Sequence, residues 1–260
     1  MVHLKHDKPA TRTATFAAVC TVFAQTLFLS ALPAAAAPTG GNNSTIKNVW
    51  IAKQVTEQGT YEIGANDTAI RIYNKDTTGG LIAKAPAWKL TIFNDKNKEQ
   101  LLATHEQWLR RVEGHVDFRS LGKPQKREKI CGLEAVVFCF KVNAYTNRVM
   151  DSLFSTRTQT FIKDRTIAFD ASSDRLPAQV VAVWDCFLQI PISNHVPLRS
   201  VSRISDGKTT SAFNTVSFEC KSVPANYFDL PHYPQKANRS WTSIFFGTQK
   251  INDFTEDFFK

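Results

Sequence analysis

The sequence predicts an α+β domain, in which a curved antiparallel sheet forms an incomplete barrel wrapped around amphipathic helices. Three observations lead to this fold class. Short apolar stretches alternate with polar residues at the strand period, two stretches have the helical period, and Asp206-Gly207 marks a hairpin turn. A hydrophobic content of 43% with 19 Phe is enough for a folded core and argues against general disorder. We expect one domain over residues 46–260.

The first 37 residues have the order of an export signal. Lys5, Lys8 and Arg12 are followed by an apolar stretch over residues 14–32 and by four alanines at 34–37. We therefore expect a signal peptide over residues 1–37, a flexible leader over 38–45, and an exported protein, periplasmic or secreted. A retained N-terminal membrane anchor is the alternative, because the apolar stretch approaches the roughly 20 residues that a membrane-spanning helix needs.

The first part of the domain is expected to be strands. We place strands at residues 69–73, 81–83 and 88–93, with Gly79-Gly80 as a turn between the first two. In the third, Trp88, Leu90 and Ile92 share one side, as in a half-buried strand.

Two helices are expected from apolar residues at helical spacing. The first is capped by Asn94 or Asp95 and carries Leu101, Leu102, His105, Trp108, Leu109 and Val112 on one face. The second follows Pro177, contains Trp184 and Phe187, and ends before Pro191.

Further strands are expected over residues 133–142, 156–162, 198–204 and 210–220. Val136, Phe138 and Phe140 share a face of the first of these, and Val216, Phe218 and Cys220 share a face of the last. The aromatic tail over 241–259 is expected to pack on the domain as a last strand and short helix, or to expose an apolar patch.

The chain is basic, with a formal net charge of +9, of which the signal segment carries +2. The densest basic group is Lys123, Lys126, Arg127 and Lys129, which we place in a loop over residues 115–129. A solvated loop is the simplest interpretation, and contact with an anionic envelope surface is the alternative. No nucleic-acid-binding motif is present, so nucleic acid is not an expected partner.

Four cysteines follow the signal segment: Cys131, Cys139, Cys186 and Cys220. In an oxidising compartment they could form two disulfides with three connectivities, while free buried thiols are the alternative. If residues 131–139 are one extended strand, the sulfurs of Cys131 and Cys139 lie about 25 Å apart and cannot bond to each other. Their spacing does not match a zinc site.

The last third of the chain resembles a known family. Residues 191–201 read Pro-Ile-Ser-Asn-His-Val-Pro-Leu-Arg-Ser-Val, a hairpin follows, and residues 223–233 close with Val-Pro-Ala-Asn-Tyr-Phe-Asp-Leu-Pro-His-Tyr. This order is similar to exported proteins of the lipoprotein-localisation-factor-like fold, which includes the periplasmic lipoprotein carriers. The resemblance covers about 45 residues. It implies a half-barrel whose apolar concavity can hold acyl chains. The four cysteines and the basic loop depart from the carriers, and their ligand-contacting residues have no clear match here.

We therefore expect a non-enzymatic protein that binds a lipid or acyl chain in a half-barrel cleft, with no cofactor or metal. An envelope scaffold or interaction protein with a filled core is the alternative. A Cys-dependent hydrolase using Cys186 or Cys131 with His195 is a third interpretation, because the two members of a Cys-His pair can be distant in the sequence. No serine-nucleophile or zinc-protease motif is present. The candidate residues for the apolar cleft are Trp88, Leu90, Ile92, Phe138, Phe140, Trp184, Phe187 and Phe218. Each of them could equally be an ordinary core residue.

Overall fold

A computed structural model describes residues 44–113, 123–141, 162–204 and 207–247. The chain divides into the units Met1–Gly41 and Asn42–Lys260, and all of the described residues belong to the second. The described elements are β1 (Thr45–Thr56), β2 (Gly59–Ala65), β3 (Ala69–Asn74), β4 (Gly79–Lys84), β5 (Lys89–Asn94), β6 (Glu99–Ala103), α1 (His105–Glu113), β7 (Lys126–Ile130), β8 (Leu133–Lys141), β9 (Ile162–Asp170), α3 (Ala178–Phe187), β10 (Pro197–Ile204), β11 (Thr209–Pro224) and α4 (Trp241–Phe246).

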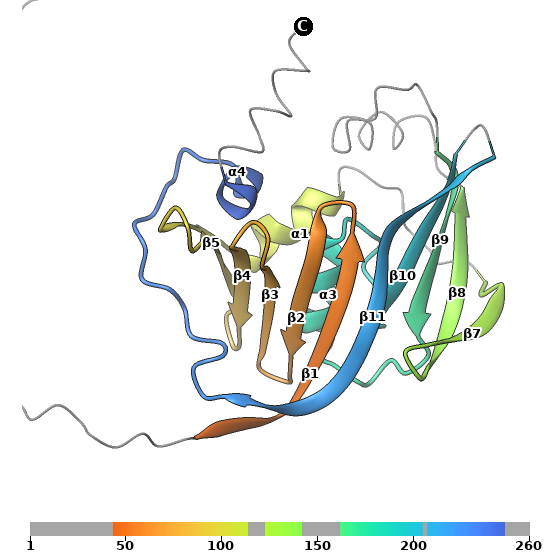
Figure 1. The fold of residues 1–260 in the computed structure, drawn as a ribbon, viewed down its shortest axis with the longest axis horizontal. Helices are drawn as coiled ribbons and strands as arrows, with labels where there is room; N and C mark the ends of the chain where they lie inside the picture. The colour runs from red at the N-terminus through yellow and green to blue at the C-terminus, as the bar shows by residue number, and fades with distance from the viewer. Residues whose placement is uncertain (1–43, 114–122, 142–161, 205–206, 248–260) are drawn as a thin grey trace, which may run out of the picture. The chain divides into compact units, whose positions relative to one another are not determined.

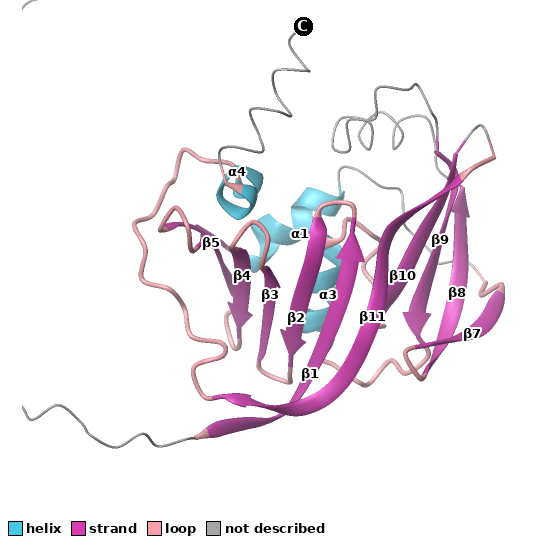
Figure 2. Ribbon diagram, viewed as in Figure 1, coloured by secondary structure: helices cyan, strands magenta, loops and turns pink. Residues whose placement is uncertain are grey.

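The described strands form one antiparallel sheet in the order β6-β5-β4-β3-β2-β1-β11-β10-β9-β8-β7 (Figure 1). The sheet is open, and its centre is the pairing of β1 with β11, which joins the start of the domain to its last long strand. The short helices lie against the sheet (Figure 2). The predicted fold class, a curved antiparallel sheet packed on helices, is confirmed.

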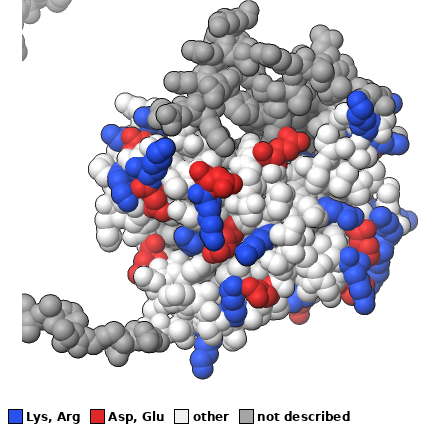
Figure 3. Space-filling view, in the orientation of Figure 1, with Lys and Arg blue, Asp and Glu red and all other residues white. Residues whose placement is uncertain are grey.

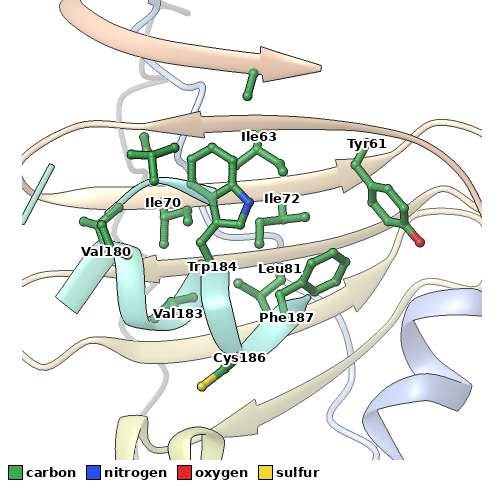
Figure 4. Close-up of a cluster of buried hydrophobic side chains, with 14 of the residues drawn as sticks. Tyr61, Ile63, Ile70, Ile72, Leu81, Val180, Val183, Trp184, Cys186 and Phe187 are labelled. Carbon is green, nitrogen blue, oxygen red and sulfur yellow. The ribbon is translucent and has the colours of Figure 1, made fainter. Parts of the chain in front are cut away.

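One row of apolar side chains crosses five neighbouring strands. Ala52, Ile63, Ile72, Leu81 and Ile92 are successive cross-strand partners, and each is fully buried. Residues directly opposite each other in a sheet point to the same face, so this row is a continuous apolar surface. Helix α3 covers it with Trp184 and Phe187 (Figure 4).

The opposite face of β1 to β5 is covered by the segment that follows β11. Phe228 packs with Val49 and Ile51, and the hydroxyl of Tyr233 donates a hydrogen bond to Asp95 at 2.8 Å. Tyr227 lies over Gly64, where an added Cβ would overlap the ring. The closing motif quoted from the sequence thus anchors the chain across the sheet.

Three local predictions were wrong. Gly79-Gly80 begins β4, and the turn lies just before it, at residues 75–78. Leu101 and Leu102 belong to β6, because Leu101 pairs with Ile92. Trp88 lies in the turn before β5, with a left-handed φ of 50°.

The first helix therefore starts at His105, well after the predicted caps Asn94 and Asp95. Thr104 caps it: the Thr104 hydroxyl accepts from the backbone N–H of Gln107, and the Gln107 side chain accepts from the backbone N–H of Thr104. This reciprocal capping box is a stronger start signal than a single asparagine or aspartate.

The remaining strand predictions agree with the structure where it describes them. Strands β8, β10 and β11 match the predicted stretches, and α3 follows Pro177 as expected. The predicted shared face of β11 is wrong for Val216, because a register shift against β1 puts Thr215 on the face of Phe218. Most of the predicted strand at 156–162 lies outside the described residues, as do residues 1–43 and 248–260. Within the described part of the chain, no helix has the length and apolar character needed to cross a membrane.

Candidate functional site

The predicted cleft residues are distributed over two apolar clusters. Leu90, Ile92, Trp184 and Phe187 belong to the larger cluster, where their exposed fractions are 8% or less, and Trp88 packs against its edge. Figure 4 shows Trp184 and Phe187 of α3 beside the sheet residues, whereas the sulfur of Cys186 points away from them. The Trp184 and Phe187 side chains fill the layer between sheet and helix.

Phe138 and Phe140 lie elsewhere. Phe138 is part of a second cluster with Ile167, Phe169, Ile190 and Phe213, and Phe140 packs against it. Two of the eight candidate cleft residues, Phe138 and Phe140, therefore lie in a different cluster from the one that contains Trp184 and Phe187.

Phe218 lies on β11, at the periphery of the larger cluster. It stacks on Trp50 with ring centroids 5.2 Å apart, and the pair packs against the larger cluster. The Arg175 guanidinium lies 4.8 Å from the Trp50 ring centroid and forms an ion pair with the buried carboxylate of Asp170. A cation on an aromatic face is attracted to the ring electrostatically. Arg175 and Asp170 were not identified from the sequence.

Helix α4 closes one end of the larger cluster. Phe245 contacts Tyr61 and Phe187 at ring-centroid distances of 6.2 and 5.3 Å, and Ile244 is fully buried beside it. The Asn94 side chain donates to the Phe245 carbonyl oxygen at 3.4 Å. The first part of the aromatic tail thus packs on the domain as a short helix, as predicted.

A buried polar network joins α3 to the sheet. The Gln54 side chain, with no exposed surface, accepts from the Trp184 indole N–H at 3.2 Å. It donates to the Pro197 carbonyl at 2.8 Å and to the Thr215 hydroxyl at 3.1 Å. These bonds fix the orientation of Trp184 against β1 and β11.

Asp185 on α3 is fully buried. Its Oδ2 accepts from the backbone N–H of Ser193 at 2.7 Å and from the Ser193 hydroxyl at 3.1 Å, while Oδ1 has no hydrogen bond to a described residue. Burial raises the pKa of the Asp185 carboxyl well above its ordinary value, which favours the neutral form. Its contacts tie the chain after α3 to the helix, so a structural role accounts for them.

Arg165 is the most unusual charged residue near the apolar clusters. It is 5% exposed on β9, and its Nε donates to the Ser200 hydroxyl at 2.7 Å. Its Nη1 donates to the Gln189 carbonyl oxygen at 3.4 Å. Burial lowers the pKa of its guanidinium to about 10. A sequence signal existed, because Arg165 has the same parity as the apolar Ile167 and Phe169 and so points to their face.

The predicted basic group lies at a sheet edge. Lys126, Arg127 and Lys129 are on β7, the edge strand, so the expected loop over 115–129 is wrong for these three, and Lys123 precedes the strand. In Figure 3, basic and acidic side chains are interleaved at the side of the molecule that carries β7.

Part of that charge is neutralised. The Lys126 ammonium lies 3.3 Å from Glu128, and the Lys129 ammonium lies 3.4 Å from Glu134. Lysines on an edge strand hinder pairing with another chain.

No disulfide joins any two of the four described cysteines. Cys131 and Cys220 are exposed, Cys139 is partly buried, and Cys186 is buried in α3. Although Cys131 is exposed as a residue, partial desolvation of its thiol raises the pKa, which disfavours the nucleophilic thiolate. His195 directs its Nδ1 to the Asp170 carbonyl oxygen at 2.9 Å.

The described residues contain no group of three or more His, Cys, Asp or Glu side chains arranged to hold a metal ion.

Comparison with known proteins gives remote likenesses to solved structures. No protein-family model matches the chain, and no curated protein matches it. A crystal structure of an uncharacterized conserved protein from Thermus thermophilus has a TM-score of 0.40 at 8% identity, covering 74% of this chain and 92% of that chain.

A domain from Vibrio parahaemolyticus provisionally assigned to outer membrane lipoprotein sorting has a TM-score of 0.24 at 8% identity. The alignment covers 70% of this chain and 88% of that domain. Because both TM-scores are below 0.5, neither supports a conclusion about function, and the resemblance stays a prediction.

Proposed function

We propose that this chain is an exported, non-enzymatic protein that binds a hydrophobic ligand, a lipid or acyl chain, between the sheet and its helices. The observation that carries the proposal is the continuous apolar row from Ala52 to Ile92 on an open sheet. In the described part of the chain, this face is covered by short helices of six to ten residues.

The covering at the α4 end is the easiest to displace. Helix α4 has six residues, and isolated helices shorter than about 12 residues are marginal in water. Its position therefore depends on packing by Ile244 and Phe245, whose apolar contacts an acyl chain could replace. Ligand uptake would exchange one set of apolar contacts for another, at low net cost in buried surface.

Ligand analysis of the purified protein tests the proposal. Native mass spectrometry of protein from its own host should show a co-purifying lipid, and delipidated protein should bind a fluorescent fatty acid with a 1:1 stoichiometry. Lipid-free protein that also fails to bind the probe at micromolar concentration would exclude this function.

A second function is an envelope interaction protein with a permanently filled core. It is favoured by the near-complete burial of Leu90, Ile92 and Trp184, whose exposed fractions are 1% or less. Its working surface would be the β7 edge, where no described acidic side chain lies within 4 Å of Lys123 or Arg127.

Vesicle binding separates the two functions. The interaction function predicts sedimentation with vesicles rich in anionic lipid, lost in the Lys123→Glu/Arg127→Glu variant and in high salt. The ligand-binding function predicts fatty-acid uptake that this variant retains.

The proposed export depends on cleavage of the N-terminal segment as a signal peptide. Edman sequencing or an intact-mass measurement of the protein isolated from its host tests whether that cleavage occurs. A mature start near residue 38 supports a cleaved signal, whereas an intact N-terminus in the membrane fraction supports the retained anchor.

We do not favour the hydrolase, since Cys186 packs in the larger cluster and the Cys131 thiol has a raised pKa.

A further inference from the structure

Arg165 is placed inside an apolar part of the sheet. Its cross-strand partners are Phe140 on β8 and Ser202 on β10, so all three side chains point to one face. Ile167, two residues along β9, has the same parity and belongs to the cluster that contains Phe138. The charged side chain therefore has Phe140 and Ile167 as apolar neighbours on this face, and the serine hydroxyl side chains of β10 as polar ones.

No described carboxylate compensates this charge. Arg165 donates to a hydroxyl and a backbone carbonyl, both neutral acceptors. The neighbouring Asp164 points to the opposite face, where it forms an ion pair with its cross-strand partner Arg203. A pKa of about 10 keeps the Arg165 guanidinium protonated at neutral pH.

The guanidinium retains unused donor capacity. Of its five N–H groups, Nε and one on Nη1 are engaged, so three make no hydrogen bond to a described residue. Burying a charge without an opposite charge costs several kcal/mol, and proteins rarely leave such a group uncompensated. A carboxylate or phosphate fits the guanidinium geometry through two parallel hydrogen bonds.

The surroundings suit the apolar part of the same ligand. Phe140, the cross-strand partner of Arg165, is partly buried, so the cluster around Phe138 is partly exposed beside Arg165. Leu188, just after α3, packs against both this cluster and the larger one. An acyl chain that begins at Arg165 could therefore continue past Leu188 into the layer between sheet and helices.

We propose that Arg165 is the head-group site of an anionic amphiphile, whose carboxylate or phosphate pairs with the guanidinium while its acyl chain lies along the Phe138 and Phe140 side of the sheet. This inference rests on the proposed ligand-binding function and adds the charge of the ligand and the position of its head.

The test compares a charged ligand with its neutral analogue in matched variants. Binding of a fluorescent fatty acid and of its methyl ester is measured at pH 7.5 for wild type, Arg165→Met and Arg203→Met. Arg203→Met removes the same charge from an exposed ion pair and is the control. Wild type and the control should prefer the acid by about tenfold or more, as one charge-assisted pair permits. Arg165→Met should lose that preference and keep its affinity for the ester.

The outcomes separate the two proposals. If wild type binds acid and ester equally, or if Arg165→Met keeps the preference, the head-group site is wrong while ligand binding stands. If wild type binds neither, both proposals fail. Circular dichroism and thermal unfolding check that each variant folds. If Arg165→Met does not fold, Arg165→Lys replaces it in the test, because lysine keeps the charge but cannot form two parallel hydrogen bonds to one anion. Arg165→Lys should bind the acid several-fold more weakly than wild type and bind the ester with unchanged affinity. Unchanged acid affinity in that variant would overturn the site.

The two sources of the anion are distinguished by competition. Palmitate and lysophosphatidate are compared as displacers of the probe, with neutral monoacylglycerol as reference. Stronger displacement by one identifies the head group, provided that its advantage over monoacylglycerol disappears in Arg165→Met. An advantage that survives in Arg165→Met contradicts the proposal.

Discussion

Gly79 lies directly beneath the carbonyl oxygen of Phe245, so closely that an ideal Cβ at position 79 would overlap that oxygen. The two residues are far apart in the sequence, and their contact seats α4 on β4. Only the absence of a side chain at position 79 allows this approach.

The Gly79→Ala variant should therefore lose the seating of α4. We expect the free energy of unfolding to fall by about 2–3 kcal/mol, as for an overpacked core, measured by urea denaturation. If α4 covers the ligand-binding face, the variant should also bind the fluorescent fatty acid more tightly than wild type.

Gly207→Ala is the matched control. Its Cβ would meet no described atom within 4 Å, so only the left-handed φ of 85° adds cost, about 1 kcal/mol. Equal stability of Gly79→Ala and wild type would contradict the observed packing of α4.

Replacing Gln54 with leucine should be strongly destabilising. The change leaves the Trp184 indole N–H and the Pro197 carbonyl buried without their Gln54 partner, and each such loss costs about 1–3 kcal/mol. We expect a decrease of about 2–5 kcal/mol in urea denaturation. Lys53→Leu, at the exposed neighbouring position, should change stability by about 0.5 kcal/mol or less. Similar effects of the two variants would mean that the buried network contributes little.

Tyr61 should make stability depend on pH in the alkaline range. Burial raises its pKa from 10.0 to about 12, so the neutral phenol is favoured in the folded state. The resulting stabilisation is fully present below pH 10 and is lost as the pH rises to about 12, because the unfolded chain ionises first. A rise of this size in the pKa corresponds to about 2–3 kcal/mol as an upper bound.

Tyr61→Phe removes this contribution and supplies the comparison. Unfolding free energies of wild type and variant are measured between about pH 9 and 12. The difference between them should shrink or reverse with rising pH, and a constant difference over that range argues against a raised pKa.

The cysteines should differ in reactivity in the native state. Cys220 is exposed and should react with Ellman's reagent first; Cys131 should react more slowly, because its raised pKa lowers the thiolate fraction. Cys186 is buried and should react only on unfolding.

Whether the cysteines are thiols or disulfides in the native protein is best measured on protein isolated from its host without reductant. Serine variants at positions 131 and 220 assign the two early phases. If no thiol reacts even in denaturant, the cysteines are paired, and the disulfides expected from the sequence would replace the thiols seen here.

Local patterns in the sequence predicted much of the sheet. Alternation over residues 133–142 identified β8 and placed Val136, Phe138 and Phe140 on one face, because a strand's side chains alternate whatever it pairs with. The helical spacing after Pro177 identified α3 for the same kind of reason. Where two periodicities competed, as at Leu101 and Leu102, pairing with β5 decided in favour of a strand, and no local signal could reveal that partner.

The sequence by itself determined the fold class, the apolar faces of β8 and α3 and the basic balance of the chain, since these follow from periodicity and composition over short windows. Tertiary structure alone decided which apolar residues meet: it separated Phe138 from Trp184, seated Phe245 on Gly79, and left Arg165 buried opposite Phe140 with no carboxylate beside it in the described chain. Such relationships depend on cross-strand register and on packing between distant segments, which are settled by the burial of the whole apolar surface and not by any one stretch.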